Sequence, residues 1–191
     1  MTIKKTYIDA NQLLLDSYEL GLQILDSNFR PDYIVGVWRG GAPVAIALHE
    51  LLDYAGIKTD HIAIRTSLYT GIRQTAATVA VEGLDYLVER VKADDKILIA
   101  DDVFDSGRSL ERVIHDLGKL CGADTPDLRI ATPYYKPANN QTEIAPDYYL
   151  HETDDWLVFP HELDGLSTDE LQREKPGLGH IRRRIAGLAE K

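Results

Sequence analysis

Fourteen residues in the middle of the chain join an apolar run to closely spaced carboxylates and small polar residues. Residues 97–110 read ILIADDVFDSGRSL. The stretch from Ser106 to Ser109 is expected to open a helix, whose unpaired N–H groups and hydroxyls favour a phosphate monoester. The carboxylates of Asp101 and Asp102 suit hydroxyl groups instead, because a carboxylate accepts two hydrogen bonds from a vicinal diol. A phosphorylated ribose therefore satisfies both halves of the motif.

Three negative charges within five residues repel one another, so this motif predicts a cation. Mg²⁺ bridging the same diol beside Asp101 and Asp102 would relieve the repulsion. Other phosphate and metal motifs fail on spacing: the lysine of a Walker A loop and the glycines of a dinucleotide fingerprint are absent. An EF-hand loop starting at Asp101 would place Val103 and Arg112 at ligand positions. Simple helix capping accounts for one aspartate, not for the pair.

The elements around the motif predict an α/β fold. Apolar runs typical of strands alternate with segments of helical periodicity, and this alternation predicts right-handed crossovers and a mainly parallel sheet. Ligands collect beyond the carboxyl ends of such strands, which is where the aspartates lie. Residues 66–77 lack a clear period and predict a long functional loop. Strands are expected at 33–38, 61–65, 78–81, 96–100, 128–132, 148–150 and 156–159, and helices at 10–27, 43–56, 84–91 and 110–120.

Composition narrows the function classes. A net charge of -10 argues against a sequence-independent binder of nucleic acid. The single cysteine, Cys121, reads as a buried helical thiol and suits a reducing cytoplasm. Neither a signal segment nor about 18 consecutive apolar residues occurs, so a cytoplasmic protein without a membrane span is expected. Arg182 to Arg184 are interpreted as the solvated end of a terminal helix, with a partner or subunit contact as the alternative.

The segment ILIADDVFDSGRSL resembles the phosphoribosyl diphosphate signature of the type I phosphoribosyltransferases, and the order of elements agrees over roughly residues 7–163. The resemblance implies a mainly parallel sheet flanked by helices, with a small hood, in a single domain. Its core would span about 28–150, its hood the N-terminal segment and about 151–165, and its helical tail 166–191. Asp101 and Asp102 would hold the ribose 2- and 3-hydroxyls. The 5-phosphate would lie in the loop of Asp105, Ser106, Gly107, Arg108 and Ser109.

Trp38-Arg39-Gly40-Gly41 matches the family's diphosphate loop in position. Two glycines expose backbone N–H groups, and Arg39 adds a fixed positive charge beside the leaving diphosphate. In relatives the peptide bond before the basic residue is often cis. The alternative is a glycine turn with a surface arginine. The resemblance also makes the 66–77 loop a lid over the diphosphate, with a merely flexible loop as the alternative for its three candidate side chains, Ser67, Tyr69 and Arg73.

The later segments indicate the base. Lys136 falls where 6-oxopurine enzymes place a lysine on the exocyclic O6, although a lysine at a strand end is also a common surface residue. An ammonium only donates, so it favours a carbonyl over an amino group. DDWLVFPHEL resembles the hood of xanthine-guanine and hypoxanthine-guanine enzymes. There Trp156 would stack on the purine or serve as core, Leu157 would offer backbone groups, and Glu162 would help bind a second Mg²⁺ through water. His161 departs from the bulky aromatic of relatives.

The resemblance implies that Asp105 is the acid/base near the purine N7, with a purely structural carboxylate as the alternative. The implied reaction is Mg²⁺-dependent transfer of 5-phosphoribosyl from phosphoribosyl diphosphate to hypoxanthine, guanine or xanthine, with Arg39 and Mg²⁺ stabilising the diphosphate. Purine salvage would be its role. A pyrimidine phosphoribosyltransferase and a nucleic-acid-binding regulator that keeps the sugar-phosphate site remain alternatives. A homo-oligomer, dimer or tetramer, is expected from the fold.

Overall fold

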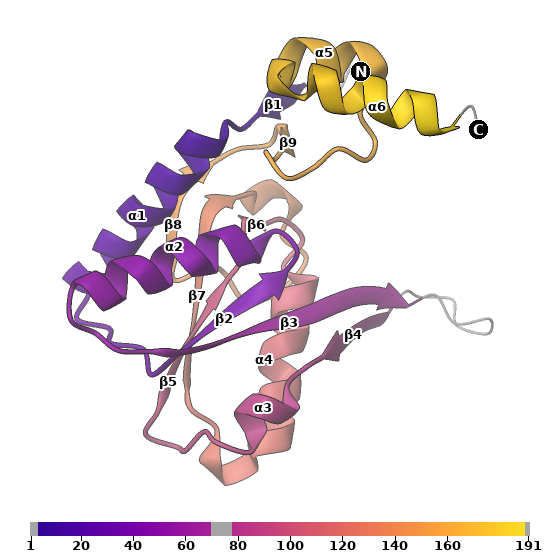
Figure 1. The fold of residues 1–191 in the computed structure, drawn as a ribbon. Coiled ribbons are helices and arrows are strands. Elements are labelled where there is room, and N and C mark those ends of the chain that lie inside the picture. Colours follow the sequence, from indigo (N-terminus) through magenta and orange to yellow (C-terminus); the bar gives the residue numbers. More distant parts are fainter. Residues whose placement is uncertain (1–3, 70–77, 190–191) are drawn as a thin grey trace. The chain divides into compact units, whose positions relative to one another are not determined.

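The computed structural model describes residues 4–69 and 78–189, which form two compact units. The larger unit spans Ala10–Asp155, and the smaller joins the start of the chain, up to Asp9, to the segment from Trp156 onward. The elements of each are labelled in Figure 1. None of the described helices is long and apolar enough to cross a membrane.

A seven-stranded sheet organises the larger unit in the part of the chain that is described. Its order is β4-β3-β2-β5-β7-β6, with β8 also paired to β7 (Figure 1). Every pair is parallel except β3 with β4. The strands are β2 (Tyr33–Trp38), β3 (Asp60–Tyr69), β4 (Thr78–Glu82), β5 (Lys96–Ala100), β6 (Val103–Phe104), β7 (Asp127–Tyr135) and β8 (Tyr148–Glu152).

Helices cover both faces of this sheet. On one face, α1 (Ala10–Asp26) packs on α2 (Gly41–Tyr54), and α2 packs on β2 and β5. A Cβ at Gly36 would lie 3.0 Å from the Cβ of Ala45, so even-numbered residues of β2 face α2. Successive strand residues point to opposite faces. Val35 and Val37 therefore face the other layer, which contains α3 (Asp85–Val88) and α4 (Arg108–Cys121).

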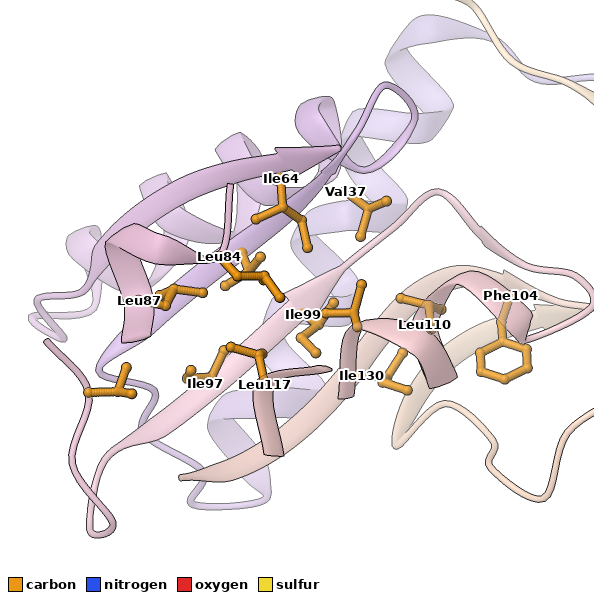
Figure 2. Packing of buried hydrophobic residues seen from close by; sticks show 13 residues of the cluster. Val37, Ile64, Leu84, Leu87, Ile97, Ile99, Phe104, Leu110, Leu117 and Ile130 are labelled. Carbon is orange, nitrogen blue, oxygen red and sulfur yellow. The ribbon is translucent and has the colours of Figure 1, made fainter. Parts of the chain in front are cut away.

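One hydrophobic cluster of the larger unit lies between the sheet and this second helical layer. Figure 2 shows side chains from the central strands and from α4 filling one layer. Ile97 and Ile99 of β5 are fully buried there, as is Leu117 of α4. Each such aliphatic side chain contributes about 1.5–3 kcal/mol when removed from water. Burial on both faces explains why β5 reads as an uninterrupted apolar run.

The α/β class with a mainly parallel sheet is confirmed, and so are the predicted long helices and the seven predicted strands. Three expectations were wrong in extent. Residues 66–69 belong to β3 rather than to a loop, because they pair with β4. β7 continues to Tyr135 instead of ending at 132, because β6 and β8 pair with its last residues. The helix expected over 84–91 is the single turn α3.

The smaller unit contains a parallel pair of three-residue strands, β1 (Lys5–Tyr7) and β9 (Trp156–Val158). Two helices follow, α5 (Thr168–Glu174) and α6 (Gly179–Ala189). The predicted terminal helix is thus present, and the Arg182 guanidinium donates a hydrogen bond to the Thr168 carbonyl at 3.0 Å. The sequence did not predict β1, which presents too few apolar residues for a clear period.

Candidate active site

Asp101 and Asp102 lie in an interruption of one line of strand pairing. Ala100 of β5 pairs with Ala131, and Val103 of β6 pairs with Tyr134, so β5 and β6 keep the same register along β7. This register places Asp102 opposite Pro133. Because proline has no N–H to donate, the ladder cannot continue at this point. The two aspartates therefore leave the sheet at its carboxyl edge, where a ligand is expected.

The glycines after β2 pack directly against these aspartates. A Cβ at Gly40 would collide with the carboxylate of Asp102, and a Cβ at Gly41 would collide with the backbone of Ala100 and Asp101. The Gly41 N–H also donates to the Asp101 carboxylate. Glycine is therefore required at both positions for the two loops to approach one another. The predicted diphosphate loop and the predicted ribose loop are neighbours in the larger unit.

The carboxylates of Asp101 and Asp102 place two like charges close together. Asp102 is buried, and its N–H donates to the Oδ1 of Asp101 at 3.0 Å. Burial and then the Asp102 charge raise the pKa of Asp101 well above its usual range, while the Asp102 and Gly41 N–H groups oppose the rise. Such a pair fits a divalent cation, which would offset the repulsion between the charges.

The donor set suits Mg²⁺ in particular. Mg²⁺ prefers oxygen ligands and usually binds through one or two carboxylates together with substrate oxygens and water. In the described part of the chain, no group of three or more His, Cys, Asp or Glu residues could hold a metal. A divalent ion at Asp101 and Asp102 would therefore depend on oxygens of the substrate.

A small open cavity of about 90 Å³ follows the aspartates. Gly107 precedes α4 with a φ of 76°, a left-handed conformation that favours glycine. The first N–H groups of the 14-residue α4 have no partner within the helix, so they favour an anion at this end. The cavity is lined by Asp101, Val103, Asp105, Ser106, Gly107, Ser109 and Leu110. Arg108 is exposed and is not among these residues.

A second loop, after β7, supports the one that forms the cavity. The Gln141 N–H donates to the Ser106 carbonyl at 3.0 Å. A Cβ at Gly107 would lie 2.5 Å from the Thr142 hydroxyl and 2.7 Å from the ring of Phe104. Gly107 is therefore fixed twice, by its backbone conformation and by close packing on both sides.

Lys136 and Asp105 form an ion pair at the same edge of the sheet. The Lys136 ammonium is buried and donates to the Oδ2 of Asp105 at 3.0 Å, while the Asp105 side chain is 47% exposed. The Asn139 amide donates to the other oxygen, Oδ1, at 3.0 Å. Sequence reasoning missed Asn139. Its place three residues after Lys136, in the turn beyond the same strand, is the signal that could have identified it.

Arg39 is exposed in the turn before α2, and the peptide bond between Trp38 and Arg39 is cis. Ser67 lies in β3 rather than in a lid. The Tyr69 side chain and Arg73 lie outside the described residues.

The four residues that the resemblance singles out in the hood, Trp156, Leu157, His161 and Glu162, lie in the smaller unit. Trp156 is 56% exposed on β9, whereas Leu157 is buried. The Glu162 carboxylate accepts the Phe159 N–H at 3.0 Å and so closes its own turn. His161, the departure from the family pattern, stacks on the Phe159 ring with centroids 5.7 Å apart. An aromatic ring is thus retained at position 161, in the form of an imidazole.

Comparison with known proteins places this geometry in a family. The phosphoribosyl transferase domain family matches residues 5–166. A purine phosphoribosyltransferase structure from Pyrococcus horikoshii is similar, with 30% identity, a TM-score of 0.65, and coverage of 86% of this chain and 98% of that one. The xanthine-guanine-hypoxanthine phosphoribosyltransferase of Helicobacter pylori shares 26% identity over 81% of this chain and 92% of its own, with a TM-score of 0.65.

A hypothetical protein from Neisseria gonorrhoeae with bound ppGpp has 21% identity and a TM-score of 0.72 over 93% of this chain and 99% of its own, which shows the shared fold. No curated protein sequence matches the chain. The match over residues 5–166 covers most of the chain, including the aspartate motif, the glycine loop after β2, and β7 with Lys136 directly after it. The chain therefore belongs to the phosphoribosyl transferase domain family.

Proposed function

We propose that the protein transfers 5-phosphoribosyl from phosphoribosyl diphosphate to a 6-oxopurine, namely hypoxanthine, guanine or xanthine, with Mg²⁺. The observation that carries the proposal is the buried Lys136 ammonium paired with Asp105 beside the cavity of the 106–109 loop. An ammonium donates and cannot accept, so it favours a base with a carbonyl oxygen over one with an amino group. The two purine-specific relatives with 30% and 26% identity support the same substrate class.

In the proposed reaction, N9 of the purine attacks C1 of the ribose while the bond from C1 to the diphosphate oxygen breaks. The base must lose a proton, and Asp105 would accept it at N7. Lys136 and Asn139 hold the two oxygens of this carboxylate, so its orientation is set before the base arrives. Lys136 would donate to O6 of the base.

The other groups would bind and orient the sugar diphosphate. The first N–H groups of α4 and the hydroxyls of Ser106 and Ser109 would hold the 5-phosphate. Arg39 would place a fixed positive charge beside the diphosphate. Asp101 and Asp102 would hold Mg²⁺ and the ribose hydroxyls, and Glu162 a second ion through water. When bound, Mg²⁺ would neutralise charge on the leaving diphosphate.

A panel of bases tests the proposal. Each of hypoxanthine, guanine, xanthine, adenine and orotate is added to the protein with phosphoribosyl diphosphate and Mg²⁺, and nucleotide formation is followed. We expect turnover with at least one 6-oxopurine and little with adenine. Turnover with adenine or orotate alone would refute the base assignment, and orotate would favour the pyrimidine alternative.

The variant Lys136→Met separates base recognition from sugar binding. Loss of a charged hydrogen bond to the base is expected to raise the KM for the base about 10- to 100-fold. The KM for phosphoribosyl diphosphate should change much less. Lys119→Met is the matched control, because Lys119 is exposed on α4. Equal damage to both KM values in Lys136→Met would count against the proposed contact with O6.

A further inference from the structure

The C-terminal tail, defined as residues 167–189, is anchored to a turn in the segment that resembles the family's hood. We call residues 159–162 the hood turn. The Lys175 ammonium donates to the backbone carbonyls of Phe159 at 2.7 Å and Pro160 at 3.1 Å, and to that of Glu162. An ammonium has three donors, so this one side chain satisfies three carbonyls of the turn. Partial burial lowers the pKa of Lys175.

A second anchor joins the tail to β1. The Glu170 carboxylate accepts hydrogen bonds from the Lys5 ammonium, from the Tyr7 hydroxyl at 3.1 Å and from the Ser167 N–H at 2.8 Å. The Lys5 ammonium is the main cause, before Ser167 and Tyr7, of a Glu170 pKa lowered to about 2. This carboxylate therefore links the start of α5 to both ends of β1.

Strand β1 in turn holds the strand that carries Trp156 and Leu157. The Trp156 N–H donates to the Lys4 carbonyl, and the Ile8 N–H donates to the Val158 carbonyl, both at 2.9 Å. Two three-residue strands are not stable by themselves, and a seven-residue helix such as α5 is too short to form alone. The contacts that the tail makes with β1 and with the hood turn therefore add to the burial of Leu157 and Val158 in holding β9.

A cavity of about 290 Å³ lies within the smaller unit beside the Trp156 indole. Its walls come from the two strands and from the segment just before the tail: Lys5, Trp156, Val158, Glu162, Asp164, Gly165 and Leu166. Lys5 and Glu162 bond directly to tail side chains, Glu170 and Lys175. The family match ends at residue 166, so the tail lies beyond the shared domain.

We propose that Lys175, assisted by Glu170, is a positioning residue for the purine. The tail fixes the conformation of the hood turn and the orientation of the Trp156 indole. It therefore determines the affinity for the base, although no tail residue contacts the base. This inference rests on the proposed function, because it assigns Trp156 and its strand to base binding.

The experiment compares Lys175→Met with the wild type in steady-state kinetics. The methionine keeps most of the apolar stem and removes all three donors. Misplacement of a binding surface by about 1 Å is expected to raise the KM for the base roughly 10- to 100-fold. The KM for phosphoribosyl diphosphate should rise much less, because only Glu162 among the residues proposed to bind it lies in the hood turn, whereas Asp101 to Ser109 lie in the larger unit. Lys175→Arg retains a cationic donor and should recover most of the loss.

Arg173→Met is the matched control, because Arg173 is exposed in the last turn of α5, two residues before Lys175, and its loss leaves the hood turn intact. If Lys175→Met does not fold, Glu170→Gln makes the same test with a milder change. A Lys175→Met enzyme with an unchanged KM for the base would overturn the inference while leaving the proposed function in place. An equal rise in both KM values would overturn it too, because the effect would then not be specific to the base.

A second readout does not depend on turnover. The chain has two tryptophans, so in a Trp38→Phe background the emission reports Trp156 alone. Lys175→Met should shift this emission and increase its quenching by acrylamide, and Lys175→Arg should not. Identical emission in all three proteins would refute the positioning role. Wild-type protein that uses no purine would refute the proposed function, and with it the assignment of Trp156 to the base.

Discussion

Substituting Gly40 by alanine tests whether the two substrate loops depend on close contact. Gly40 has φ and ψ of -63° and -36°, which alanine adopts without strain. The added Cβ, however, would overlap all three terminal atoms of the Asp102 carboxylate. The buried carboxylate must therefore move, or the loop after β2 must retreat from it. The substitution perturbs the site by volume alone, since no charge or hydrogen-bonding group is changed.

The size of both effects follows from this overlap. Overpacking by one methyl group costs about 1–3 kcal/mol of stability. For a chain of this length that corresponds to a fall in Tm of roughly 2–12 °C. A displacement of Asp102 by about 1 Å should lower kcat/KM for phosphoribosyl diphosphate by about 100-fold.

Thermal unfolding followed by circular dichroism and initial rates with saturating base provide the two measurements. Gly118→Ala is the matched control, because a Cβ there would meet only Thr125, at 4.0 Å. It replaces a glycine inside α4, so stability should rise by about 0.5–1 kcal/mol with activity unchanged. If Gly40→Ala kept kcat/KM within twofold of the wild type, the contact between the two loops would not matter for substrate binding.

Two further predictions concern stability. The Thr132 side chain is fully buried, and its hydroxyl has no hydrogen-bond partner among the described residues. Thr132→Val should therefore stabilise the fold by about 1 kcal/mol and raise Tm by about 2–4 °C. A lower Tm would mean that the hydroxyl is hydrogen-bonded in solution. The pKa of Glu170, lowered from 4.5 to about 2 chiefly by Lys5, means that its ionised form stabilises the fold, fully above about pH 4.5 and progressively less as the pH falls towards 2. The Tm difference between wild type and Glu170→Gln should therefore shrink over that range, and a difference independent of pH would contradict the assigned ion pair.

Most of the fold could be predicted from periodicity. The helix over 10–27 was identified by apolar residues at helical spacing, and the strands at 33–38 and 96–100 by short continuous apolar runs, which are typical of strands buried on both faces. The chain was also placed in its family by the aspartate motif, whose residues are contiguous. The strand extensions at 66–69 and 133–135 could not be predicted, because Ser67 and Pro133 are weak strand formers that pairing partners hold in place.

Contacts between residues far apart in the chain could not be predicted from the sequence. The roles of Asn139 and Lys175 depend on hydrogen bonds across 34 and up to 16 residues, and nothing local to either residue announces its partner. The same holds for Asp16, buried in α1, which accepts a hydrogen bond from the Tyr134 hydroxyl of β7, 118 residues away.

The sequence by itself determined which residue types stand at the carboxyl end of β5, and hence the chemistry of a phosphorylated sugar. Only the tertiary structure decided that Gly40 must abut Asp102, and that Lys136 and Asn139 share one carboxylate. The reason is physical. Periodicity and motifs are properties of neighbouring residues, whereas steric fit and the pairing of buried charges arise only when the folded backbone brings separate loops within a few ångströms.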